Sequence, residues 1–273
     1  FNHIHDMPRN GVFIFRNQGG NIIEANHIHD VLKRTNDGGA VHLASMNPLS
    51  APTQIVDNRI YRVGYQGGGT KVRLAFGIYP DWFTSHLTIR GNIVSDTRDG
   101  GIRLLGGSDT TIEDNVVGDD PAASVVFGSW MTNSVNGLVL RGNTIVNGQG
   151  EWVRYYTGGN GPPIDQVALR PSEYWVSAHN TYWGRGTGGG IAIARSQRDA
   201  LRPGDRKFGL AEIQQAGAEQ GSVEREGGAN GVIDTSENPE RFGLGADTLK
   251  RMQHPRSTED AKAWLHRLTR AAI

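Results

Sequence analysis

The pentapeptide Asn-His-Ile-His-Asp occupies residues 2–6 and returns unchanged at residues 26–30. Looser copies begin at four further asparagines, which are Asn58, Asn92, Asn115 and Asn143. Successive copies are 24, 32, 34, 23 and 28 residues apart. A spacing near 23 residues is too short for a βαβ unit, which needs roughly 30 residues or more, and it fits one coil of a parallel β-helix.

Two columns of aliphatic side chains keep register with these asparagines. One lies two residues after each asparagine and comprises Ile4, Ile28, Ile60, Val94, Val117 and Ile145. The other lies three residues before each asparagine from the second copy on, and comprises Ile23, Ile55, Ile89, Ile112 and Leu140. We therefore predict an all-β fold, a single-stranded right-handed parallel β-helix with coils about 4.8 Å apart, asparagines stacked at one corner and aliphatic side chains inside. Asn180 is expected as a last, degraded corner.

A second strand recurs between the asparagines. It is expected at residues 11–15, 39–43, 76–80, 100–104 and 124–128, with residues 151–156 and 190–194 continuing it. Side chains alternate along a strand, so one set points inward and the next points outward. The predicted inward set is Val41, Ile78, Ile102 and Val126, and the predicted outward column is His42, Tyr79, Arg103 and Phe127.

The composition excludes several classes of function. The charge is balanced, with 28 Lys and Arg residues against 28 Asp and Glu residues, so nucleic acid and anionic membranes are not indicated as partners. No apolar run approaches membrane-spanning length, and the absence of cysteine excludes disulfides and thiol chemistry. The 38 glycines favour a tight-cornered β structure over helices.

The fading of the repeat predicts two parts, a β-helix over residues 1–198 and a C-terminal extension over residues 199–273. Within the extension we expect a short helix at residues 208–218 and a terminal helix at residues 257–268 that packs on the solenoid. Because Asn2 already occupies a corner, an N-terminal cap is missing, and we expect a longer polypeptide or a second chain to cover the first coil. No signal peptide begins at Phe1, although the chain is expected to be secreted or periplasmic.

Two aspartates are the main catalytic candidates, with Asp37 directly before its strand and Asp81 directly after the next one. One coil spacing plus the length of the strand is expected to bring their carboxyl groups within about 5–10 Å, the range that glycosidases use. Carboxylates in different surroundings can divide the acid and base roles. The alternative is that Asp37 only begins an Asp-Gly turn. Asp99 repeats the Asp-Gly-Gly pattern one coil later and competes with Asp37.

Several other side chains near the aspartates suit sugar binding. His42, Tyr79 and Arg103 form a polar column that can orient hydroxyl groups, although a solvated β face would show the same pattern. Trp82 and Trp130 can stack on sugar faces, although buried aromatic side chains at coil corners are at least as common. Asp99 completes the predicted substrate-binding set.

The histidines of the repeated pentapeptide are a candidate metal site. His3 is expected to lie over His27, and His5 over His29. Zinc would fit such a set of ligands. A solvent-facing strand copied between repeats explains the pairs more simply, so no metal site is predicted.

Three motifs carry a resemblance to known proteins. They are Asp-Gly-Gly-Ala-Val-His at residues 37–42, Gly-Ile-Tyr-Pro-Asp at residues 77–81 and Gly-Gly-Ser-Asp at residues 106–109. Together they resemble the right-handed parallel β-helix glycoside hydrolases of the pectate-lyase-like superfamily, a group that includes α-L-fucosidase and xylanase activities. The resemblance extends over roughly residues 1–240 and implies that Asp37 and Asp81 are catalytic. The sequence departs from the group at His42, where tyrosine is usual, and at Trp82, which replaces a second aspartate.

The favoured function is hydrolysis of glycosidic bonds in a polysaccharide or oligosaccharide, without a cofactor. One of Asp37 and Asp81 would protonate the leaving oxygen, and the other would attack or activate water. The alternative is a polysaccharide lyase or uronate epimerase, in which Ca²⁺ held by Asp81 and Asp99 neutralises the uronate and Arg103 or Tyr79 serves as the base. A third possibility is a non-catalytic carbohydrate-binding solenoid.

Overall fold

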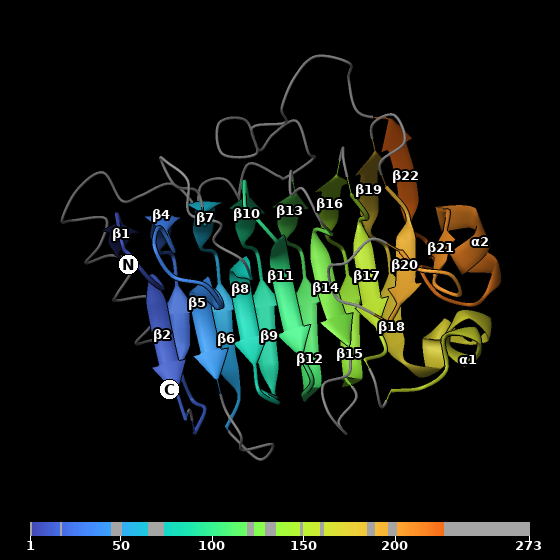
Figure 1. Cartoon of the computed structure of the whole chain (residues 1–273), viewed down its shortest axis with the longest axis horizontal. Coiled ribbons are helices and arrows are strands. Elements are labelled where there is room, and N and C mark those ends of the chain that lie inside the picture. Colours follow the sequence, from blue (N-terminus) through green and yellow to red (C-terminus); the bar gives the residue numbers. More distant parts are fainter. Residues whose placement is uncertain are drawn as a thin grey trace, which may run out of the picture.

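The computed structural model describes residues 2–16, 18–44, 51–64, 74–118, 123–128, 135–147, 150–158, 161–184, 189–195 and 201–226. These residues form a solenoid of stacked coils, seen with its long axis horizontal in Figure 1. Each complete coil contributes one strand to each of three sheets, and neighbouring coils pair in parallel. The predicted all-β parallel β-helix is confirmed.

The three sheets run along the whole described solenoid. Sheet 1 contains β1 (His3–His5), β4 (His27–Val31), β7 (Arg59–Val63), β10 (Ile93–Ser95), β13 (Val116–Gly118), β16 (Thr144–Asn147), β19 (Thr181–Gly184) and β22 (Val223–Glu226). Sheet 2 contains β2 (Val12–Phe15), β5 (Gly38–Ala44), β8 (Ala75–Asp81), β11 (Gly100–Leu105), β14 (Val125–Gly128), β17 (Val153–Tyr156), β20 (Ile191–Ala194) and β21 (Arg206–Phe208). Sheet 3 contains β3 (Ile22–Glu24), β6 (Thr53–Val56), β9 (Leu87–Arg90), β12 (Ser108–Glu113), β15 (Asn136–Arg141) and β18 (Trp175–Ala178).

The interior of the solenoid is lined by the two aliphatic columns that the sequence predicts. In sheet 1, Ile28, Ile60 and Val94 lie in register on successive strands, and all three are 0% exposed. Each such side chain stabilises the fold by about 1.5–3 kcal/mol through burial alone. The hydrophobic repeat therefore supplies one continuous core along the solenoid axis.

The repeated asparagines form a hydrogen-bonded ladder at one corner. Each side-chain Nδ2 donates to Oδ1 of the asparagine in the next coil, at distances of 2.9–3.1 Å. The ladder comprises Asn2, Asn26, Asn58, Asn92, Asn115, Asn143 and Asn180. The backbone N–H of each asparagine from the second to the sixth also donates to the next Oδ1. The predicted corner at Asn180 is confirmed.

The ladder ends on a buried glutamate. Nδ2 of Asn180 donates to Oε2 of Glu219 at 3.0 Å, and the Ser222 hydroxyl donates to the same oxygen at 2.8 Å. Glu219 is 0% exposed. Its carboxylate therefore takes the place of the next asparagine by accepting the last amide donor of the column.

The C-terminal part of the described chain stays attached to the sheets. Two short helices, α1 (Ile164–Leu169) and α2 (Leu210–Gln215), lie at one end of the solenoid together with a 3₁₀ turn at Pro171–Glu173 (Figure 1). The helix expected at residues 208–218 is thus confirmed in its central part. Strand β22 pairs with β19, so sheet 1 continues to Glu226, and the division at residue 198 stays a prediction. The helix expected at residues 257–268 lies outside the described residues.

One predicted strand register is wrong. The outward column was expected to end in Phe127, but β14 pairs so that Val126 lies beside Arg103 and Phe127 beside Leu104. Phe127 is 0% exposed and makes an edge contact with Trp175 at 5.4 Å inside the solenoid. Because side chains alternate with a period of two, this shift by one residue exchanges the inside and the outside of the strand.

The described residues were also searched for membrane-spanning helices. None of their helices has the length and apolar character needed to cross a bilayer.

Candidate functional site

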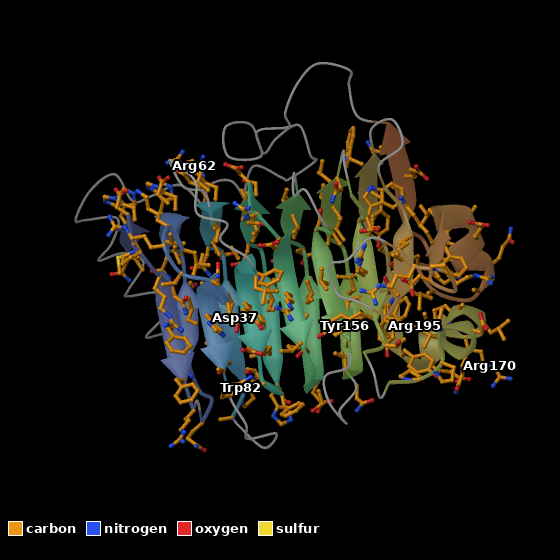
Figure 2. The ribbon with its side chains drawn as sticks, in the orientation of Figure 1. Asp37, Arg62, Trp82, Tyr156, Arg170 and Arg195 are labelled. Carbon is orange, nitrogen blue, oxygen red and sulfur yellow. The ribbon has the colours of Figure 1, made fainter. Side chains whose placement is uncertain are left out.

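The two candidate aspartates lie at opposite ends of neighbouring strands of sheet 2. Asp37 directly precedes β5 and is exposed, as Figure 2 shows on the sheet face. Asp81 ends β8, is 5% exposed and pairs in register with Ala44, the last residue of β5. The seven residues of β5 therefore separate the two positions along the strand, a backbone distance of about 20 Å. The expectation that their carboxyl groups lie within about 5–10 Å is wrong, because the length of the strand lies between them.

A histidine and an asparagine hold the Asp81 end of the site. Nε2 of His42 lies 3.4 Å from Oδ2 of Asp81, and Nδ2 of Asn10 lies 3.0 Å from Nδ1 of His42. The amide of Asn10 donates to Nδ1, so the ring proton is on Nε2 and points to the carboxylate. All three side chains are buried, at 5–6% exposed. Asn10 therefore fixes the tautomer and the orientation of His42.

The turn after Asp81 also supports its carboxylate. The backbone N–H of Trp82 donates to Oδ1 of Asp81 at 2.8 Å. Trp82 and Phe83 both have positive φ angles, of 47° and 62°, which bulky side chains rarely adopt. Elsewhere in the described chain, two consecutive left-handed residues are glycine pairs. Strain of this kind is typical of functional sites, and here it aims a backbone donor at the carboxylate.

Tyr79 connects the two ends of the site. Its ring stacks on His42 with the centroids 4.6 Å apart and the planes 12° apart. Its hydroxyl donates to Oδ1 of Asp37 at 3.4 Å. Burial raises the pKa of Tyr79 well above its usual range, Arg103 partly offsets this rise, and the nearby Asp81 and Asp37 add to it. Tyr79 therefore stays a protonated hydrogen-bond donor at every physiological pH.

Arg103 packs against the aromatic side chains of this cluster. Its guanidinium carbon lies 4.6 Å from the ring centroid of Phe76 and 4.7 Å from that of Tyr79. Arg103 is 1% exposed, so the polar column is a buried array and the alternative of a solvated face is wrong. Tyr156 joins the same side, because β17 places it two coils beyond the position of Leu105. We call Asp37, His42, Tyr79, Asp81 and Arg103 the aspartate cluster.

The greater part of the chain matches one known protein family. The model of the family described as the right handed beta helix region matches residues 2–168, which is well over half of the sequence. The chain belongs to the right-handed β-helix family. No curated protein and no solved structure matches it. Membership is compatible with carbohydrate-active enzymes, and it names no activity or substrate.

Three exposed aromatic side chains border the aspartate cluster of this β-helix. Phe13, Phe15 and Trp82 are 45%, 49% and 39% exposed. The ring centroids of Phe15 and Trp82 are 5.8 Å apart, and that of Phe13 is 4.8 Å from His42. Trp82 is thus on the surface, where its face can meet a ligand, as Figure 2 indicates at the lower edge of sheet 2. Sugar rings stack readily on such faces.

The remaining predicted binding residues lie elsewhere. Asp99 precedes β11, and its Oδ2 accepts the backbone N–H of Ala75 at 2.9 Å, so it supports a strand end. It lies at the starting end of the strands, whereas Asp81 lies at the finishing end, and the two do not form a shared Ca²⁺ site among the described residues. Trp130 lies outside the described residues.

Sequence reasoning missed Asn10, Phe76 and Tyr156. Tyr156 belongs to the expected continuation of the second strand, and a correct register would have placed it in the column of Asp81. Phe76 begins the strand segment containing Tyr79 and was assigned no role. Asn10 carries no sequence signal, because its contact with His42 arises only from the stacking of two coils.

A separate cleft of about 620 Å³ lies beside α1. Its lining includes Thr157, Asp165, Arg195 and Arg206, and Figure 2 shows Arg195 displaced along the solenoid from Asp37. Arg206 and Asp165 are 3.8 Å apart at the surface. The cleft contains none of the predicted site residues, so the chemical argument rests on the aspartate cluster.

Proposed function

We propose that this β-helix protein hydrolyses glycosidic bonds of a polysaccharide or oligosaccharide at the aspartate cluster. The observation that carries the proposal is the buried Asp81 carboxylate, which accepts from the Trp82 N–H and faces the Nε2 proton of a His42 ring fixed by Asn10. A carboxylate that must stay ionised next to a substrate benefits from such donors.

The two aspartates have different surroundings, which suits a division of roles. Asp81 is enclosed by N–H donors and serves as the nucleophile or the base that activates water. Asp37 is exposed and accepts from the hydroxyl of Tyr79, but it lies about 20 Å of backbone from Asp81, which is farther than the about 5–9.5 Å between paired glycosidase carboxyl groups. It therefore contacts a sugar unit further along the strand. The bond between the anomeric carbon and the leaving oxygen breaks as Asp81 attacks or activates water, and the leaving oxygen takes its proton from water.

The other side chains of the cluster position the sugar. Tyr79, kept protonated by its raised pKa, holds Asp37 through its hydroxyl, and Arg103 supplies fixed positive charge one coil further along the column. Phe13, Phe15 and Trp82 offer exposed rings on which sugar faces stack. The substrate therefore lies across several coils of sheet 2, as expected for a chain of sugars rather than a single one.

The second candidate is a polysaccharide lyase, and the observation that favours it is the contact between Arg103 and Tyr79. A lyase neutralises a uronate carboxylate and removes the proton at the adjacent carbon, which a buried Arg, Tyr and His set could perform. The product would carry an unsaturated sugar that absorbs ultraviolet light. The Asp81 and Asp99 positions give no support to the Ca²⁺-dependent form of this reaction.

The test is a panel of glycans, neutral and uronate-containing, scored for new reducing ends and for ultraviolet-absorbing ends. Hydrolysis predicts reducing ends without absorbance, and Asp81→Asn lowers the rate by about 10²–10⁴-fold. The matched control is Asp165→Asn, whose side chain is 84% exposed beside α1. Absorbing ends would establish the lyase, and glycan binding without turnover by the unaltered chain would establish a non-catalytic solenoid.

A further inference from the structure

Four histidines gather on the outer face of sheet 1, away from the aspartate cluster. β1 and β4 pair so that His3 lies beside His27 and His5 beside His29. Both pairs stack, with centroids 4.7 Å and 5.3 Å apart and planes within 10° of parallel. The stacking predicted from the repeated pentapeptide is confirmed, and it concentrates imidazole nitrogens in one place.

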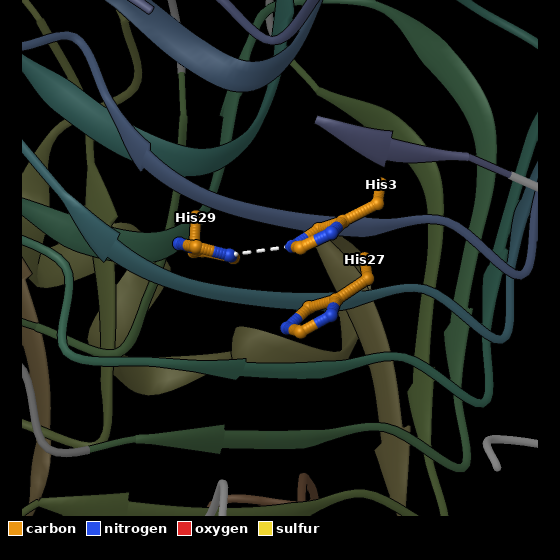
Figure 3. Close-up of side chains that lie close together, drawn as sticks. All are labelled: His3, His27 and His29. Atoms are coloured by element: carbon orange, nitrogen blue, oxygen red, sulfur yellow. Dashed lines mark hydrogen bonds between the residues drawn. The ribbon is translucent and has the colours of Figure 1, made fainter. Parts of the chain in front are cut away.

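Three of these rings bring a nitrogen atom to the same part of the sheet. His3, His27 and His29 each offer a ring nitrogen, and these atoms all lie within 4.8 Å of one another. Figure 3 shows the rings of His3 and His27 parallel, with His29 facing them, and Nε2 of His3 is 2.7 Å from Nε2 of His29. The triangle follows from strand geometry, because residues two apart on one strand and a neighbour on the next share one face.

A carboxylate orients the central histidine. Nδ1 of His29 lies 2.6 Å from Oδ2 of Asp30, and Arg62 grips the same carboxylate with NH2 at 2.6 Å and Nε at 3.0 Å. The guanidinium of Arg62 holds the Asp30 carboxylate in place beside His29, where it can accept the Nδ1 proton. The lone pair of His29 is then on Nε2, the nitrogen that faces His3.

Tyr61 supports the two histidines of the triangle that lie on β4. Its ring stacks on His29 with centroids 4.9 Å apart, and its hydroxyl lies 2.9 Å from Nε2 of His27. Both β4 histidines therefore have fixed ring orientations before any ion binds. A carboxylate behind one imidazole and a packed partner beside another are the supporting contacts that histidine metal sites use.

We propose that His3, His27 and His29 bind one late first-row divalent metal ion, of the Zn²⁺ or Cu²⁺ kind, and thereby tie the coil of β1 to the coil of β4. Three neutral imidazoles without a carboxylate ligand favour these ions over Mg²⁺ and Ca²⁺. Bonds of about 2.0–2.1 Å in tetrahedral geometry require nitrogen atoms about 3.3 Å apart. On binding, the Nε2 atoms of His3 and His29, now 2.7 Å apart, separate by about 0.6 Å, and the more distant nitrogens, up to 4.8 Å apart, move closer by rotation of the side chains. The fourth position is left for water.

The test is isothermal titration of the tag-free full chain with ZnCl₂, after treatment with EDTA. We expect one ion per chain, with affinity at least about tenfold weaker in His3→Gln and His29→Gln, and about tenfold weaker in Asp30→Asn. The matched control is His179→Gln, an exposed histidine beyond β18 that should leave binding unchanged. Thermal unfolding without metal checks that each variant folds.

Titration with Co²⁺ gives a second readout that needs no variant. Three imidazoles and a water around Co²⁺ give the intense visible bands of a four-coordinate ion, whereas a loosely bound ion keeps the weak spectrum of the hydrated form. The proposal is overturned if the unaltered chain binds no Zn²⁺ at about 0.1 mM, if His3→Gln and His29→Gln bind as tightly as the unaltered chain, or if Co²⁺ shows only the hydrated spectrum.

Discussion

Replacement of Asn92 by alanine tests the asparagine ladder at its centre. The Asn92 side chain is 0% exposed and takes part in five hydrogen bonds. Nδ2 donates to the carbonyls of Ile55 and Arg90 and to Oδ1 of Asn115, and Oδ1 accepts from the backbone N–H and Nδ2 of Asn58. Alanine removes all five bonds and leaves the buried backbone N–H of Asn58 without an acceptor.

The expected cost follows from these contacts. A buried donor left without an acceptor lowers stability by about 1–3 kcal/mol, and each further lost hydrogen bond lowers it by about 0.5–1 kcal/mol after exchange with water. Asn92→Ala should therefore lower the free energy of unfolding by about 3–7 kcal/mol, and by an amount near the lower end if water enters the gap. Urea unfolding followed by circular dichroism measures the change, provided that the slope with urea is unaltered.

Two other asparagines serve as graded controls. Asn2 is exposed at the end of the ladder and makes one bond to Asn26, so Asn2→Ala should cost less than about 1 kcal/mol. Asn136 begins β15 with an exposed side chain, and Asn136→Ala should stay within about 0.5 kcal/mol of the unaltered chain. If Asn92→Ala costs no more than Asn136→Ala, the ladder does not stabilise the coils in the way argued here.

Three further predictions concern the site and the core. Asn10→Ala should lower kcat about tenfold at unchanged KM, because His42 loses its fixed orientation, and an unchanged kcat would contradict the positioning role. Trp82→Ala should raise KM about 2–10-fold with kcat retained, measured on the best glycan, and an unaltered KM would remove Trp82 from the binding surface. Burial raises the pKa of Tyr156 and of Tyr182, so above pH about 10 the unfolded chain loses protons that the folded chain keeps, and stability should fall by about 1.4 kcal/mol per pH unit for each tyrosine. Tyr182→Phe should make the free energy of unfolding, measured by urea titration at several alkaline pH values, fall less steeply with pH. If the dependence on pH is as steep as in the unaltered chain, Tyr182 does not contribute in this way.

The fold was largely readable from the sequence because the repeat carries two independent signals. The asparagine spacing located the corners, including Asn180, and the flanking aliphatic residues located the interior. Both signals are local to each coil, so variable loop lengths do not disturb them. The failure at Phe127 has the opposite cause, since no asparagine anchors the second strand and a one-residue shift reverses its faces.

The site was only partly readable from the sequence. His42, Tyr79 and Arg103 were placed on one column, because adjacent strands with similar glycine patterns align well. The contact of Asn10 with His42 was not foreseeable, because it depends on how two coils stack at a corner. The sequence placed Asp37 before one strand and Asp81 after the next, but the expected closeness of the two carboxyl groups neglected the length of the strand between them, which is about 20 Å for the seven residues of β5.

The most direct test of the central claim is the turnover of Asp81→Asn on the glycan that the unaltered chain cleaves best, with glycan binding measured on the same samples. The exchange of one oxygen for nitrogen keeps the shape of the side chain and the Trp82 N–H donor. The account predicts reducing-end release slowed by about 10²–10⁴-fold while binding and stability are retained, with Asp165→Asn fully active. Turnover by Asp81→Asn at the rate of the unaltered chain would contradict it.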